Sequence, residues 1–291
     1  MNAASRGNRL FDVVLYVLLF ISLVACLAPF LHIVSISMSS NKPILSGQVT
    51  IFPMELNFSA YSRVLADPTM LRSLWFSAYL TVIFTVFCMV MTILAAYPLT
   101  KKELKGRRFV MYLIVFTMFF SGGIIPEYIL IKQLHLLNSM WSLVLPLLVN
   151  PFYMIIMMTF FQNIPKSLEE SAELDGSSHF GTLVRIILPL SMPVIATLSL
   201  FYAVNRWNGF MDTLFYITDP NLYPLQLKLY QMVMNSMMTD QMQMEGAQII
   251  QVLPESLKAA SIVFATLPIL IVYPWLQRYF VSGIMLGSVK G

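Results

Sequence analysis

The sequence predicts an all-α, polytopic membrane protein with six transmembrane helices. The 291-residue chain is 58% hydrophobic and only 11% charged, and its mean hydropathy is +0.74. The apolar residues are gathered in six runs that contain no Asp or Glu. Each run is about 17–25 residues long, which at 1.5 Å per residue of helix is enough to cross a hydrocarbon layer of about 30 Å. A soluble domain, with roughly 25% charged residues, is excluded.

A short polar head precedes the predicted spans. Residues 1–12 form this head, and residues 13–291 form a single membrane domain. The spans are expected at residues 13–37, 74–97, 109–126, 140–161, 186–204 and 259–280. Cys26 and Cys88 fall inside two of these spans and should pack as small apolar side chains, so we expect neither a disulfide nor a metal site.

The outer segments between the spans carry weaker signals. In the first of them, residues 35–73, a short amphipathic helix is predicted by the spacing of Phe58, Tyr61 and Leu65. A glycine pair and Pro126 should bend or end the third span, and residues 127–139 should form a short outer loop. Residues 205–258 form a second large outer region.

The distribution of Lys and Arg predicts which loops face the cytoplasm. Residues 98–108 hold five basic residues against a single Glu. A six-span chain with both ends on one side groups 11 of the 18 basic residues on that side: Arg6, Arg9, Lys101, Lys102, Lys105, Arg107, Arg108, Lys166, Arg185, Arg278 and Lys290. Because cytoplasmic loops are enriched in basic residues, both termini, loop 98–108 and loop 163–185 are predicted to be cytoplasmic.

The loop 163–189 is unusual for a cytoplasmic loop because it is acidic. Two basic residues stand there against Glu169, Glu170, Glu173 and Asp175. A short helix is predicted after Pro165, with a capping box between Ser167 and Glu170 and a stop at Gly176.

The predicted helix in this loop is amphipathic. Its apolar face consists of Ile164, Leu168 and Ala172. A helix that lies on lipid favours Lys and Arg on its polar face, so the carboxylates favour a protein partner. An ordinary solvated connecting helix is the alternative.

The spacing within this loop resembles a known family. Glu170-Ser171-Ala172 is followed after three residues by Gly176 and after nine more by Ile186-Ile187-Leu188-Pro189. This pattern resembles the EAA loop of bacterial ABC importer permeases with the type I, MetI-like fold, in particular the carbohydrate-uptake branch of MalG-like and alginate-type permeases. The resemblance covers essentially the whole chain. Ser171 departs from it, because the family usually has Ala there.

The resemblance implies that the loop is the coupling element of a transporter. Its coupling residues would be Glu169, Glu170, Ser171, Ala172, Asp175, Gly176, Leu188 and Pro189. The implied partners are a dimeric cytoplasmic ATPase, a second, non-identical permease subunit and an extracytoplasmic sugar-binding protein. ATP and Mg would be bound by the ATPase, so we expect no cofactor on this chain and no enzyme activity. Accordingly, the sequence contains no G-x-x-x-x-G-K-[ST] phosphate loop.

The expected location is the bacterial cytoplasmic (inner) membrane, with lipid and no nucleic acid as a partner. A secondary transporter normally needs ionisable groups at mid-membrane, and the six predicted spans contain no Asp or Glu. A passive channel has no need for an acidic docking helix. An importer of a non-sugar solute is the closer alternative.

The substrate pathway is predicted less directly. Aromatic and amide side chains that suit a sugar cluster in two places, comprising Asn150 and Tyr153 in the fourth span and Tyr202, Asn205, Trp207 and Asn208 at the end of the fifth. Ordinary packing is the alternative for each of them. Arg206, with Lys228 and Lys258, would suit an acidic oligosaccharide such as an alginate fragment. The Met-rich run 232–244 would suit an adaptable contact with the binding protein.

Overall fold

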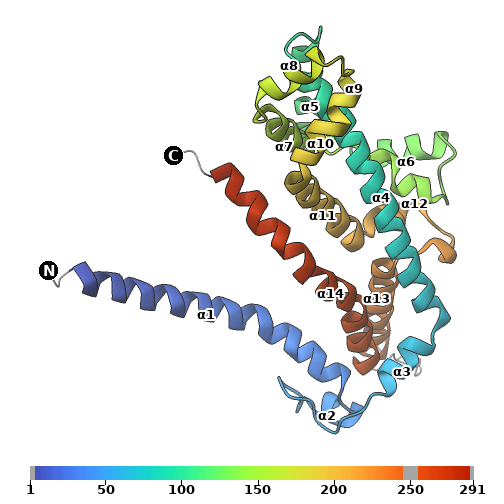
Figure 1. The fold of residues 1–291 in the computed structure, drawn as a ribbon. Coiled ribbons are helices and arrows are strands. Elements are labelled where there is room, and N and C mark those ends of the chain that lie inside the picture. Colours follow the sequence, from blue (N-terminus) through green and yellow to red (C-terminus); the bar gives the residue numbers. More distant parts are fainter. Residues whose placement is uncertain (1–3, 245–254, 289–291) are drawn as a thin grey trace. The chain divides into compact units, whose positions relative to one another are not determined.

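The computed structural model describes residues 4–244 and 255–288, and within them the chain is almost entirely helical (Figure 1). The principal helices are α1 (Ala4–Ser37), α4 (Pro68–Thr100), α5 (Arg107–Phe119), α6 (Ile124–Gln133), α7 (Pro151–Gln162), α8 (Lys166–Leu174), α11 (Met192–Asn208), α13 (Leu225–Met244) and α14 (Glu255–Ser288). Short elements connect them: α2 (Asn41–Leu45), α3 (Ser59–Ala66), α9 (His179–Thr182), α10 (Leu188–Leu190) and α12 (Met211–Tyr216). In the described ranges, β pairing is limited to one bridge, between Ser39 and Leu56.

The helices belong to two compact units. The first comprises residues 1–71 and 229–267, and the second comprises residues 72–228 and 268–291. The helices α4, α13 and α14 each continue from one unit into the other.

The first unit contains the long helix α1 and the segment that follows it. The short helix α3 forms where the spacing of apolar residues predicted one, but its buried residues are Ala60 and Val64. Phe58 is the N-cap of this helix, and Phe58 and Leu65 are both more than half exposed, so these apolar residues of the predicted pattern do not lie in the core. Tyr61 instead uses its hydroxyl, which lies 2.7 Å from the Ser37 hydroxyl.

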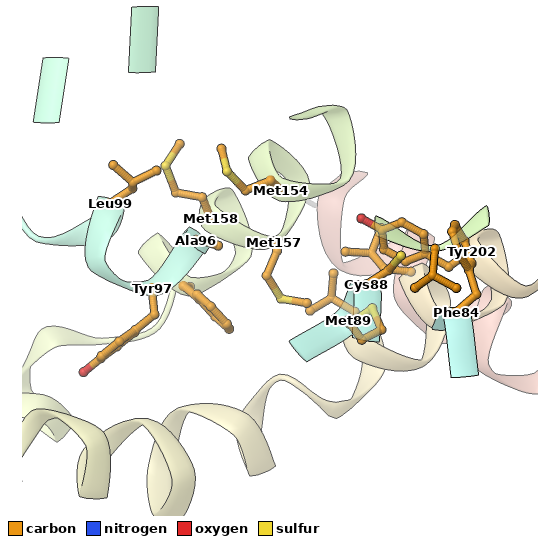
Figure 2. Close-up of a cluster of buried hydrophobic side chains, with 14 of the residues drawn as sticks. Phe84, Cys88, Met89, Ala96, Tyr97, Leu99, Met154, Met157, Met158 and Tyr202 are labelled. Atoms are coloured by element: carbon orange, nitrogen blue, oxygen red, sulfur yellow. The ribbon is translucent and has the colours of Figure 1, made fainter. Parts of the chain in front are cut away.

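The second unit is built on a core between α4, α7 and α11. Figure 2 shows methionines of α7 (Met154, Met157 and Met158) in one buried cluster with residues of α4 such as Cys88 and Met89. Tyr202 of α11 joins the same cluster beside Phe84, at 6.0 Å between ring centroids. Flexible thioether side chains fill irregular gaps well, which suits a core between helices that cross at an angle.

Among the residues that the structure describes, three helices are long and apolar enough to cross a membrane unbroken. These stretches are Phe11–Ser37, Pro68–Thr100 and Glu255–Pro274. Three further helix pairs meet the same test only when taken together, and each is bent at a short break: Arg107–Phe119 with Ile124–Gln133 by 116°, Met140–Leu147 with Pro151–Gln162 by 51°, and His179–Leu190 with Met192–Asn208 by 82°. Six spans result if each bent pair is one span.

The bends have identifiable causes in the sequence. The third predicted span ends at Phe119, and α6 starts after Gly123, whose φ of +85° lies in a region that side chains disfavour. As a result, the predicted loop 127–139 is partly wrong, because α6 occupies it as far as Gln133. In the fifth predicted span, the break falls at buried Ser191, between Pro189 and Pro193.

Candidate functional site

The acidic loop contains the predicted helix as α8, but the predicted capping box is wrong. The helix begins at Lys166 with Pro165 as its N-cap, and no side chain caps it. Ser167 is therefore already inside the first turn, two positions after the N-cap. The hydrocarbon ring of Pro165 carries no acceptor atom, so the first N–H groups of the helix receive no hydrogen bond from an N-cap side chain.

The stop at Gly176 is confirmed. Gly176 has φ +80° and donates from its N–H to the Glu173 carbonyl at 3.0 Å, while the Ser177 N–H donates to the Ala172 carbonyl at 2.9 Å. These two bonds form a Schellman motif, which closes a helix through a glycine in the left-handed region. The end of α8 is thus fixed by backbone geometry.

The side chains of α8 divide into a small buried side and a large exposed one. Ala172 is buried and Ile164 is half-buried, whereas Leu168 is 41% and Leu174 89% exposed. The predicted apolar face therefore packs only in part. The predicted coupling residues Glu170, Ser171 and Asp175 are exposed. The helix presents both apolar and acidic groups to its surroundings.

Two of the carboxylates are engaged within the chain. Glu169 forms an ion pair with Lys101, and Glu173 lies 3.5 Å from the Nδ1 atom of His179. Burial by itself would lower the pKa of Lys101, but the hydrogen bond and charge of Glu169 outweigh it, so this pKa is raised above its usual range. Lys101 is consequently charged at physiological pH.

The loop returns to the membrane domain through short elements. Ser178 caps α9 by accepting from the Gly181 N–H at 3.1 Å, and α9 packs against both α8 and a π-helical turn, Leu183–Ile187. Beyond that turn lies α10, in which Leu188 is half-buried and Pro189 exposed. A cavity of about 410 Å³ lies beside this region, lined by Leu94, Tyr97, Pro98, Lys101, Leu104, His179, Phe180 and Leu183.

Three of the predicted pathway residues meet in one polar cluster. The Tyr202 hydroxyl lies 2.8 Å from the Thr92 hydroxyl and accepts from the Asn150 N–H at 3.2 Å. The ring of Tyr153 packs edge-to-face on Tyr202, at 4.8 Å between centroids. The Asn150 side chain caps α7, accepting from the N–H groups of Phe152 and Tyr153. These polar groups therefore satisfy one another, which is the packing alternative stated above.

The structure corrects the role expected for Arg206. Its guanidinium is buried, pairs with Asp212 through both carboxylate oxygens, and donates to the carbonyls of Gly209 at 3.1 Å and Leu143 at 3.3 Å. It also lies 5.7 Å from the centroid of the Phe84 ring. Arg206 is thus neutralised within the chain and does not offer a free charge to an acidic sugar.

The remaining predicted pathway residues do not join this cluster. Asn205 and Asn208 are exposed, and Asn208 donates to the Val204 carbonyl at 3.0 Å. Trp207 is buried and lines a second cavity, of about 460 Å³, between α4, α11 and α14. Lys258 pairs with Glu255, so it too is compensated. The Met-rich run lies in α13, and the adjoining residues 245–254 are outside the described ranges.

Sequence reasoning missed Lys101, Thr92 and Asp212 as partners. In the sequence, Lys101 was used only as one of the basic residues that predict which loops face the cytoplasm. Its partner Glu169 is 68 residues away. Thr92 and Tyr202 are 110 residues apart. Asp212, by contrast, follows Arg206 by six residues. Opposite charges so close together in an apolar region were a readable signal for an ion pair.

Comparison with known proteins identifies the family. Residues 60–285 match the family described as "Binding-protein-dependent transport system inner membrane component". The chain belongs to this family. The permease is 42% identical to the Bacillus subtilis polygalacturonan/rhamnogalacturonan transport system permease protein YtcP, covering 98% of this chain and 99% of that protein. It is 43% identical to the protein LplC of the same organism, covering 99% and 97%.

A solved structure shares the fold of the permease. A crystal structure of a bacterial ABC transporter involved in the import of the acidic polysaccharide alginate contains a chain that matches with a TM-score of 0.82 and 32% identity, over 94% of this chain and 98% of that chain. The predicted all-α, MetI-like permease fold is confirmed. The chain is a membrane transport subunit, an inner membrane component that works with a binding protein.

Proposed function

We propose that this permease is half of the translocation pathway of an ATP-driven importer of acidic oligosaccharides. The observation that carries the coupling part is α8, an exposed helix that shows carboxylates and apolar side chains together while its end is fixed by the Gly176 turn. Leu174, which is 89% exposed beside these charges, would be covered by such a protein partner.

The partner of α8 is a cytoplasmic ATPase dimer, which binds ATP and Mg. Glu170, Ser171 and Asp175 face that partner, and Ala172 holds the helix against its own chain. Movement of the ATPase on ATP binding carries α8 with it. The orientation with both termini in the cytoplasm, which the basic residues favour, puts α8 on the side where ATP is found.

A second, similar but non-identical permease completes the pathway, since one chain provides half of it. Alternating access then opens the bundle outward to receive the sugar from the extracytoplasmic binding protein. The Met-rich run 232–244 of the sequence would suit an adaptable contact with that protein.

The choice of an acidic oligosaccharide rests on the relatives. One relative is named for the transport of polygalacturonan and rhamnogalacturonan, and one solved transporter is involved in the import of alginate. Galacturonan and alginate are both acidic polysaccharides. Because Arg206 is already paired with Asp212, the substrate's charge must be met by other groups or by the second subunit. Asn205 and Asn208 are exposed amides that can bind hydroxyl groups.

The substrate class is tested with the reconstituted complex and its binding protein. ATPase activity should be stimulated by uronate oligosaccharides and less by neutral maltooligosaccharides of the same length. Stimulation by amino acids or phosphate alone would contradict the carbohydrate assignment. Greater stimulation by the neutral sugars would contradict the acidic one.

The coupling role is tested by Glu170→Lys and Gly176→Pro. The first reverses a charge at the expected interface, and the second removes a backbone conformation that proline cannot adopt. Both should abolish uptake while the protein still inserts into the membrane. Normal uptake by both variants would contradict the proposal.

A further inference from the structure

The end of α4 contacts α8 through two residues that are 68 positions apart in the sequence. Lys101 directly follows Thr100, the last residue of α4, and its ammonium pairs with Glu169 on α8. The two side chains are only 25% and 21% exposed. The pair is therefore better shielded from solvent than an ordinary surface ion pair, and it is less weakened by salt.

The ammonium of Lys101 is also held from a second direction. It lies 5.0 Å from the centroid of the Tyr97 ring, on the last full turn of α4. That ring is buried and packs edge-to-face on Phe161 of α7, at 6.2 Å between centroids. An aromatic face and the carbonyl end of a helix both attract a cation. The position of Lys101 is thus set by Tyr97 of α4, which itself packs on α7, as well as by Glu169.

This contact gives α8 a third attachment to the membrane domain. Along the chain, α8 is joined to α7 by residues 163–165 and to α11 through α9 and α10. The Lys101–Glu169 pair connects it, in addition, to α4, a helix of 33 residues and about 50 Å. The same helix carries Thr92, which bonds the Tyr202 hydroxyl in the buried polar cluster.

We propose that the Lys101–Glu169 pair is a latch that transmits the movement of α8 to α4, and from there to the cluster of Thr92, Tyr202 and Asn150. Lys101 and Glu169 are then positioning residues of the transport cycle. This inference rests on the proposed role of α8 as the element that the ATPase moves. Without the pair, α8 would lose its ion pair with the end of α4 and would act on the bundle through its covalent connections and the packing of Ala172.

The test uses charge reversal and charge exchange in the full transporter. Lys101→Glu and Glu169→Lys each place like charges in contact, and the double variant restores an opposite pair. Uptake per ATP hydrolysed should fall about tenfold in each single variant, a typical size for coupling between two sites. The double variant should recover part of this loss, because its carboxylate at position 101 lacks the attraction of the Tyr97 ring and of the carbonyl end of α4. Lys101→Arg should retain wild-type uptake. Lys102→Glu is the matched control, since its side chain is exposed one residue further on.

The outcomes separate the latch from the proposed function. If the single reversals transport as well as wild type, or if the double variant is no better than the singles, the latch does not exist. Glu170→Lys is measured in parallel. When Glu170→Lys abolishes uptake and Lys101→Glu does not, only the latch is overturned. When Glu170→Lys and Gly176→Pro also transport normally, the coupling role of α8 and the latch fail together.

Discussion

Two polar regions of this permease differ in where their charges are satisfied. Around Tyr202 and Arg206, hydroxyl, amide and guanidinium groups bond to one another inside the bundle. Around α8, Glu170 and Asp175 are exposed beside large apolar side chains such as Leu174. The first region needs no partner to be stable, whereas the second leaves groups that a partner can use.

The two regions show how structural polar residues can be told apart from interface residues in a membrane bundle. A polar residue in an apolar span suggests a substrate site, but the structure shows that Arg206 and Tyr202 are bound by their own chain. A polar residue in a loop suggests mere solvation, but α8 combines charge with exposed apolar surface.

The largest expected effect is that of Arg206→Ala on stability. The change leaves the Asp212 carboxylate without its partner beside a buried core, which costs about 3–5 kcal/mol of unfolding free energy. Thermal unfolding of the purified permease in detergent measures it. Lys132→Ala, at an exposed position, is the control and should stay within about 0.5 kcal/mol of wild type. Equal stability of the two variants would show that the Arg206 pair is not structural.

Tyr202→Phe should be the next most damaging change. It removes a hydroxyl that serves both Thr92 and the Asn150 N–H, leaving buried groups unpaired at a cost of about 1–3 kcal/mol. Tyr79→Phe, on an exposed part of α4, is the matched control. Both variants are compared by thermal unfolding and by uptake. Loss of uptake at full stability would instead make Tyr202 a substrate contact.

Gly176→Ala tests the turn at the end of α8. An alanine at φ +80° is strained by about 1–2 kcal/mol, although nothing lies within 4 Å to clash with its Cβ atom. Gly122→Ala is the control, because that glycine has no left-handed φ and its Cβ would meet only Pro126 at 3.8 Å. Unfolding measurements on both variants should show the difference. No difference would mean that the turn tolerates a side chain.

Leu174→Gln should change stability least and assembly most. Leu174 is 89% exposed in the chain, so the isolated permease should unfold within about 0.5 kcal/mol of wild type. Retention of the ATPase subunit on the tagged permease should fall, because the variant loses apolar surface at the interface. Leu45→Gln, at a position 84% exposed in the first unit, should alter neither measurement. Unchanged ATPase retention would remove Leu174 from the interface.

Local patterns determined much of this protein. Apolar runs of membrane length, the acidic segment 163–185 and the glycine that ends α8 are all contained in neighbouring residues, because spans, helices and turns obey rules of short range. Glycine and proline in the sequence indicated only some of the bends within the three broken spans. Their angles of 116°, 51° and 82° depend on how the helices pack.

The tertiary structure alone decided which polar groups are free. Lys101 and Glu169 are 68 residues apart, and Thr92 and Tyr202 are 110 apart, so no local pattern joins them. Arg206 and Asp212 are only six residues apart, but Arg206 also donates to the carbonyl of Leu143, which is 63 residues away. The sequence sets the chemistry of a side chain, but its neighbours in space decide whether it is free to bind a ligand or a partner. In a helical bundle those neighbours come from distant parts of the chain.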